Sequence, residues 1–326
     1  MKTKAILMTV ALAAGLPALM GQNISELRDQ AKLLFGPLPD KMPGSEKDTP
    51  ARIELGRKLY FDKQLSVNNS QACNSCHMLD NNRAGVDNQR TSLGAHGKRG
   101  DRNSPTTLNA GFHLAQFWDG RAKDLQEQAK GPVLNPVEMA MPDEATVVQR
   151  LTADSSYKDL FASAFPNASE RITYDNVAEA IAAFERTLIT HDRFDDFMNG
   201  DDKALSETEL KGLELFMSVG CITCHMSPTM GGNMYQKIGL INPYENTEDK
   251  GRFSVTKDEN DMYKFKVPSL RNIALTFPYF HDGALMSLRD AVKKMAHMQL
   301  GRELEDGEAD LLVAFLKTLS DKKLAP

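Results

Sequence analysis

The scarcest residues in this 326-residue chain are tryptophan, which occurs once, and cysteine, which occurs four times. After the N-terminal segment, no apolar run approaches the ~20 residues that a membrane-spanning helix needs. Low-complexity tracts and long blocks of one charge are also missing, and the formal net charge of −5 argues against nucleic acid as a partner. The rest of the composition is that of an ordinary globular protein, with a length that fits two domains.

All four cysteines lie in two copies of one motif, Cys-x-x-Cys-His. The copies are Cys73 to His77 and Cys221 to His225. Two thiols on one tight turn can add across the vinyl groups of a porphyrin, and the adjacent histidine then becomes the proximal iron ligand. A zinc site would not require histidine directly after each pair, and a redox dithiol has no use for a second copy. The motifs therefore predict two covalently attached c-type haems, with Cys73, Cys76, Cys221 and Cys224 as attachment points and His77 and His225 on iron.

The N-terminus has the pattern of a secretory signal peptide. A short basic segment, residues 1–4, is followed by the apolar run 5–20 and small residues near Ala18 and Gly21. A membrane anchor is the competing interpretation, but the run is short for a span and contains Gly15 and Pro17. We expect residues 1–21 to be removed by cleavage near residues 20 to 22. The mature protein is then expected in the periplasm, where c-type haems are attached.

Helical periodicity surrounds both motifs, and strand alternation is rare. Apolar residues recur at helical spacing over 24–35 and 173–189, and 51–61 leads towards the first motif. After a polar stretch at 192–203, Ser206 and Glu209 have the form of a capping box ahead of an apolar helix ending at Met217. We therefore expect a mainly α fold with two cytochrome c-like helical domains, each carrying one haem. Residues 22–190 form the first and 191–326 the second, and the 22–45 segment is a candidate to pack on the second.

Several segments outside the motifs make the chain resemble bacterial dihaem cytochrome c peroxidases. The resemblance runs in a consistent order from about residue 25 to 320. It is carried by residues 94–106 (GAHGKRGDRNSPT), 116–121 (QFWDGR), 127–132 (EQAKGP), 268–272 (PSLRN), 278–283 (PYFHDG) and 299–301 (QLG).

The resemblance implies a six-coordinate electron-transfer haem in the C-terminal half, with His225 and a methionine on iron. The matching methionine is Met295, and a thioether ligand raises a haem potential, which suits an electron reservoir. Met298 and His297 are the rival ligands, and methionines in general pack cores.

The N-terminal haem is implied to meet peroxide. His77 is its proximal ligand, and His96 is the candidate distal ligand that closes the iron in the oxidised enzyme. Many relatives have histidine directly after the first glycine of this loop, whereas Ala95 intervenes here, so the register can differ by one residue. The glycines of the loop suit a ligand that must leave. The alternative is a surface histidine on a polar loop.

Glu138 occupies the family's catalytic glutamate position. Peroxide cleavage needs a group that takes a proton from one oxygen and delivers it to the other, and a carboxylate in an apolar setting can have a raised pKa that suits this task. Gln128 matches the distal glutamine that orients peroxide by hydrogen bonding. A surface glutamate and a solvated helix glutamine are the alternatives.

Trp118 matches the family's tryptophan between the two haems, where it couples electron transfer; a core tryptophan is the alternative and is compatible with that role. Asn103, Thr276 and Pro278 match the calcium ligands at the domain junction, through one side-chain amide and two backbone carbonyls. His281 lies near that segment and is not placed on iron.

The expected reaction is reduction of hydrogen peroxide to water by a cytochrome-c peroxidase, with electrons from a monohaem cytochrome c or a small copper protein. Reduction of the second haem is expected to release His96 from the first iron. A homodimer is implied by the family. Two alternatives stay open: a dihaem oxidase of a protein or organic substrate, whose best-known type has tyrosine where Met295 stands, and an electron-transfer cytochrome without catalysis.

Overall fold

The computed structural model describes residues 23–324, so the expected signal peptide lies outside the described residues. Helices dominate, and two short strands form one antiparallel sheet. No helix within residues 23–324 combines the length and the apolar character needed to cross a bilayer. The helices and strands are α1 (Ile24–Phe35), α2 (Pro50–Tyr60), α3 (Cys73–Cys76), α4 (Leu125–Leu134), α5 (Glu144–Ala153), α6 (Ser155–Ala164), α7 (Tyr174–Glu185), α8 (Arg193–Met198), α9 (Glu207–Val219), β1 (Tyr235–Lys237), α10 (Phe253–Thr256), β2 (Lys264–Lys266), α11 (Leu288–Met295) and α12 (Asp306–Lys317), with short 3₁₀ and π turns between them.

The helices expected from apolar periodicity are confirmed at α1, α2 and α7. The capping box ahead of α9 is also confirmed. The Ser206 hydroxyl accepts a hydrogen bond from the Glu209 amide at 3.4 Å, and Glu209 Oε2 accepts one from the Ser206 amide at 2.8 Å. These local signals suffice because each helix has an apolar stripe to bury and a side chain that satisfies its first amides.

Two expectations need correction. The polar stretch 192–203 contains helix α8, which buries Phe194, Phe197 and Met198. Asp192 caps this helix by accepting a hydrogen bond from the Asp195 amide at 3.0 Å. The helix before the second motif ends at Val219 and not at Met217. Six residues are too few for periodicity to reveal α8, although its cap and its phenylalanines are visible in the sequence.

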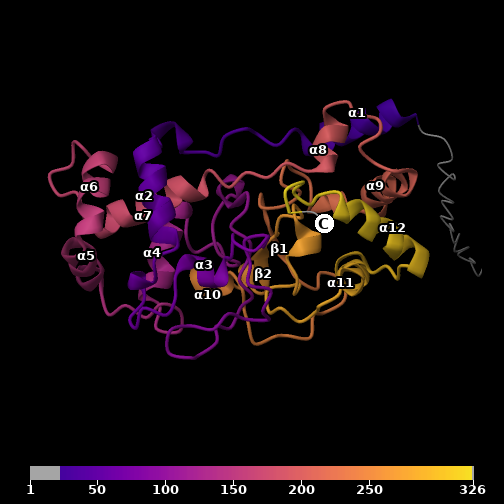
Figure 1. Cartoon of the computed structure of the whole chain (residues 1–326). Coiled ribbons are helices and arrows are strands. Elements are labelled where there is room, and N and C mark those ends of the chain that lie inside the picture. Colours follow the sequence, from indigo (N-terminus) through magenta and orange to yellow (C-terminus); the bar gives the residue numbers. More distant parts are fainter. Residues whose placement is uncertain (1–22, 325–326) are drawn as a thin grey trace, which may run out of the picture.

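The described chain has two large hydrophobic cores. The first is formed by buried residues between 55 and 184, chiefly from α2 and α4 to α7. The second combines α1 with α8, α9 and α12, so that Phe35 packs edge-on against Phe194 at 5.7 Å between ring centroids. Figure 1 shows the two groups of helices at opposite sides, with long coil segments and the small sheet between them.

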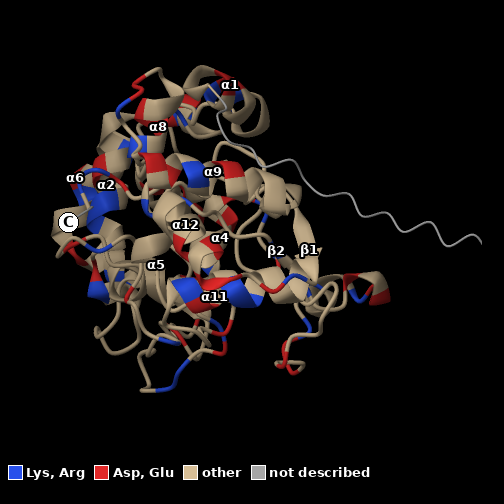
Figure 2. Cartoon of the chain, turned by 90° about the vertical axis from the view of Figure 1, so that its right-hand side faces the viewer, with Lys and Arg blue, Asp and Glu red and all other residues tan. Residues whose placement is uncertain are grey.

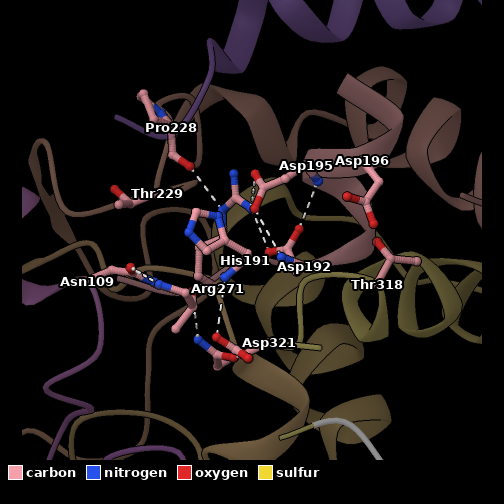
Figure 3. Close-up of polar contacts among 12 residues, drawn as sticks. Asn109, His191, Asp192, Asp195, Asp196, Pro228, Thr229, Arg271, Thr318 and Asp321 are labelled. Carbon is pink, nitrogen blue, oxygen red and sulfur yellow. Dashed lines mark hydrogen bonds and ion pairs between the residues drawn. The ribbon is translucent and has the colours of Figure 1, made fainter. Parts of the chain in front are cut away.

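A buried polar network centres on Arg271, which lies beside α8 (Figure 3). Arg271 donates to Asp192 at 2.5 Å and to Asp195 at 2.7 Å, with all but 1 % of its side chain buried. Next to this pair, Asn109 Nδ2 donates to the Thr190 hydroxyl at 2.7 Å. A buried cation of this kind is tolerated because both of its partners are anions and are fixed by hydrogen bonds.

Acidic and basic residues are interspersed over the side of the molecule that carries α9, α11 and α12 (Figure 2). Helix α11 itself carries Arg289, Lys293 and Lys294 together with Asp290. A mixed surface of this kind gives weaker long-range steering than a face of one sign.

Candidate functional site

The first Cys-x-x-Cys-His motif forms the short helix α3, and His77 follows it directly. The thiols of Cys73 and Cys76 are unpaired. His77 Nδ1 lies 2.9 Å from the carbonyl oxygen of Pro105. A carbonyl can only accept, so Nδ1 carries the proton and Nε2 is left as the nitrogen that can bind a metal. Burial lowers the pKa of His77, which favours the neutral imidazole that iron requires.

The second motif repeats this arrangement. Cys221 and Cys224 are unpaired, and His225 Nδ1 lies 2.9 Å from the carbonyl oxygen of Met230. Burial lowers the pKa of His225 and raises that of Cys221 to about 12. Both halves therefore offer two neutral thiols beside one oriented imidazole.

One continuous cavity of about 1520 Å³ joins the two motifs. Sites for a single small molecule usually measure ~300–1,000 Å³, so this cavity is larger than one ligand needs. Its lining includes all four cysteines and both motif histidines, and it is mostly apolar. His281 also lines it, and both of its ring nitrogens are buried without a hydrogen-bond partner. The residues present fit two covalently attached haems, each held by two thioether links and one imidazole.

The cavity also brings together the expected peroxide-handling residues. Gln128 lies on α4 and Glu138 on the segment that follows it, and both line the cavity. Glu138 Oε1 accepts a hydrogen bond from Asn135 Nδ2 at 2.7 Å. Burial raises the pKa of Glu138, while the positive charge of Arg121 and the Asn135 hydrogen bond oppose the rise. A carboxyl group with a raised pKa can both accept and return a proton near neutral pH.

Met295 is the last residue of α11 and lines the cavity. Its two rivals do not: Met298 is fully buried in the second half of the chain, and His297 pairs with Glu303. Of the three candidates, Met295 is therefore the residue that could supply a thioether ligand to a haem bound at the second motif.

Trp118 lines the cavity between the residues of the two halves. Its indole Nε1 donates to the carbonyl oxygen of Asn103 at 2.8 Å, and its ring meets that of His281 edge-on at 6.5 Å. Because the backbone amide of Lys266 donates to the Trp118 carbonyl at 2.7 Å, the residue is fixed to both halves of the chain.

His96 is exposed and does not contact the cavity in this structure. The neighbouring amide of Ala95 donates to the carbonyl oxygen of Glu138 at 2.7 Å, which ties the loop to the segment that carries Glu138. Ligation of the first iron by His96 stays a prediction that requires this loop to move.

The three expected calcium ligands all line the cavity. The Asn103 amide donates to the His281 carbonyl at 2.7 Å, and its Nδ2 donates to Gln89 at 3.0 Å, which leaves Oδ1 for another partner. Within residues 23–324, no group of three or more His, Cys, Asp or Glu side chains is placed to hold a metal ion. A calcium site built from Asn103 and the carbonyls of Thr276 and Pro278 would not form such a group.

Several ionisable residues that the sequence did not single out also line the cavity, and Lys266, His113 and Glu185 are three of them. Burial raises the pKa of Glu185 to about 8, and its Oε2 has no hydrogen-bond partner. The sequence could have indicated that Glu185 is buried, because it lies four residues after Ile181 on the buried face of α7. Lys266 carries no such signal, since a lysine in a short strand is usually exposed.

Comparison with known proteins agrees with this geometry. The family model for di-haem cytochrome c peroxidase matches residues 50–203. The cytochrome c551 peroxidase of Pseudomonas aeruginosa is 46% identical over 308 residues, covering 91% of this chain and 87% of the relative. That of Nitrosomonas europaea is 47% identical over 270 residues, covering 82% and 79%.

A solved structure extends the similarity to the fold. The crystal structure of a MauG-like protein associated with microbial copper homeostasis superposes with a TM-score of 0.79 at 30% identity, over 89% of this chain and 95% of the other. The mainly helical fold with a place for two c-type haems is thereby confirmed. The two haem-attachment motifs, the shared cavity and the extent of these matches together show that the chain belongs to the di-haem cytochrome c peroxidase family.

Proposed function

We propose that this protein reduces hydrogen peroxide to water with electrons from a small redox donor. One observation carries the proposal: Glu138 and Gln128 line the same cavity as His77, while Met295 lines it on the side of the second motif. An electron carrier without catalysis would have no use for a partly buried carboxyl group beside the haem-binding histidine.

The protein residues have separate roles at the first motif. Gln128 orients peroxide by hydrogen bonding, and Glu138 accepts the proton of one peroxide oxygen and returns it to the departing one. The haem, when bound, supplies the iron that binds peroxide and the electrons that cleave it. The apolar lining excludes water, which strengthens the interactions of Glu138 inside the cavity.

His225 and Met295 would hold the iron of the second haem, which would supply the entry point for electrons from the donor. The thioether favours the reduced state, and Trp118 couples this centre to the first one. We propose His96 as the ligand that closes the first iron in the fully oxidised enzyme. Its exposed position here fits the open form that meets peroxide.

The remaining proposals concern assembly and location. The two hydrophobic cores support a division of the mature chain near residue 190, with α1 packed on the second unit. Calcium is proposed at Asn103, Thr276 and Pro278. A signal peptide at residues 1–21, a periplasmic location, a homodimer and a donor that is a monohaem cytochrome c or a copper protein complete the proposal.

The deciding experiment measures peroxide turnover with reduced cytochrome c, for the fully oxidised enzyme and for enzyme pre-reduced by one electron. The spin state of each haem is recorded in parallel. Activity only after half-reduction, with a high-spin first haem, supports the peroxidase and the departing His96. Equal activity in both states retains the peroxidase and removes the gate. If neither state turns over and both haems stay low-spin, the chain is an electron carrier.

A further inference from the structure

Lys266 on β2 is a buried ammonium group that lines the cavity. Only 7 % of the residue is exposed. Its Nζ donates to the carbonyl oxygen of Ala115 at 2.8 Å and lies 3.3 Å from His113 Nδ1. Both of these partners are uncharged acceptors, so they satisfy hydrogen bonds without neutralising the charge.

No carboxylate among the described residues forms an ion pair with Lys266. The nearest electrostatic influence is Asp119, but that carboxylate already accepts from Arg102 at 2.6 Å and from Arg121 at 3.0 Å. Burial accordingly lowers the pKa of Lys266 to about 7, with Asp119 opposing the shift. A fully buried cation is expected to have an anionic partner, as Arg271 has in Asp192.

His113 fixes the position of the ammonium. Its ring packs so closely against Gly232 that a Cβ on that glycine would lie 2.2 Å from the ring Cδ2 atom. The Leu114 amide next to it donates to the Gly232 carbonyl at 2.8 Å. The imidazole therefore cannot rotate away, and burial beside Lys266 lowers its pKa, so it acts as a neutral acceptor.

We propose that Lys266, held by His113, binds a propionate carboxylate of one of the two haems. Each haem brings two carboxylates into the cavity, and peroxide is neutral, so propionates are the anions that this chemistry supplies. The inference rests on the two-haem site and not on peroxide turnover. A positive charge at a propionate stabilises the reduced haem and so raises its potential.

The test compares the haem-loaded variants Lys266→Met and Lys266→Arg with the wild-type protein. The matched control is Lys264→Met, two residues away on β2, where the lysine is partly exposed and paired with Asp261. The readouts are the midpoint potential of each haem and the propionate bending bands of the resonance Raman spectrum. Neither readout depends on enzyme activity, so both still test the role of Lys266 if the peroxidase proposal fails.

In Lys266→Met we expect the equilibrium constant for reduction of one haem to fall about tenfold, which lowers its midpoint potential by 59 mV for one electron. The propionate bending band of that haem should also shift. The haem that responds identifies the propionate. Lys266→Arg should keep the potential and shift the band, because the charge stays while the donor geometry changes. Lys264→Met should change neither.

Unchanged potentials and bands in Lys266→Met would overturn the proposal. If that variant does not take up haem, an unchanged band in Lys266→Arg overturns it instead. A wild-type potential that depends on added chloride, with the Lys266→Met shift abolished by salt, would assign the ammonium to a solvent anion and likewise overturn it.

Discussion

The two halves of the cavity share one architecture on the side of the motif histidines. His77 and His225 each direct Nδ1 to a backbone carbonyl 2.9 Å away. The opposite side is also built alike: a turn closed by a backbone bridge spans 116–122 in one half and 279–285 in the other. Each turn has a phenylalanine with positive φ, 66° at Phe117 and 70° at Phe280.

The halves diverge on the helix that follows each turn. Counted from Phe117 and Phe280, α4 and α11 begin at the same distance. At that spacing, Met295 on α11 corresponds to Pro132 on α4, and both residues line the cavity. One scaffold thus carries a thioether in the second half and a side chain without a donor atom at the corresponding position of the first half. Under the proposed function, this difference would close the second iron and leave the first one open to peroxide.

Loss of the Glu138 carboxyl group in the first half should give the largest effect. We expect Glu138→Gln to lower peroxide turnover by about 10²–10⁴-fold, because proton transfer to and from peroxide is lost. Steady-state kinetics with reduced cytochrome c measures this, with exposed Glu144→Gln as the control. Turnover within a factor of two of wild type would remove Glu138 from the reaction.

The halves also differ nine residues before Phe117 and Phe280. Buried Arg271 stands directly before Asn272 in the second half, whereas Leu108 stands before Asn109 in the first. We expect Arg271→Leu to lower the free energy of unfolding by about 3–5 kcal/mol, because Asp192 and Asp195 are left as unpaired buried anions. Urea unfolding of the haem-loaded protein measures it. Arg289→Leu removes a partly exposed cation whose partners Asp306 and Asp310 are themselves exposed, so it should leave the midpoint nearly unchanged. An equal loss there would refute the argument.

Pro132→Met would make the first half resemble the second. A thioether at this place should bind the first iron in most molecules. Turnover should then fall by about tenfold, because it is proportional to the fraction of molecules whose first iron is still open to peroxide. The visible and electron paramagnetic resonance spectra of the half-reduced enzyme report the spin state. Pro132→Ala, which removes the ring without supplying a ligand, should keep a high-spin first haem. A high-spin haem in Pro132→Met would break the correspondence between α4 and α11.

The smallest expected effect concerns the pH dependence of the first half. Burial raises the pKa of Glu138 and Arg121 opposes that rise, so turnover that needs the carboxylate should fall as the pH drops through this raised pKa. Arg121→Gln should move the acidic limb of the pH profile to higher pH by less than about one unit, because the charge is partly exposed. A shift to lower pH would contradict the assignment of that limb to Glu138.

Local sequence was enough for the parts whose physics is local. The two Cys-x-x-Cys-His turns bring thiols and imidazole together within five residues, and α1, α2 and α7 follow from apolar spacing. The candidates Glu138, Gln128 and Met295 came from resemblance, and the structure places all three at the cavity. Helix α8 was missed because it is short and its burial depends on α1, which lies far away in the sequence.

Tertiary structure alone decided which of several similar residues face the haem cavity. Met295 and Met298 are indistinguishable by type and close in sequence, but Met295 ends α11 and lines the cavity, whereas Met298 lies in the π turn that follows and is fully buried in the second core. The exposed position of His96 and the buried, unpaired charge of Lys266 were equally invisible, because exposure and charge pairing depend on segments far apart in the sequence, such as Ala115 and Lys266. The sequence by itself therefore determined what chemistry the protein carries, and the folded chain determined where that chemistry is open, because burial and coordination depend on long-range packing.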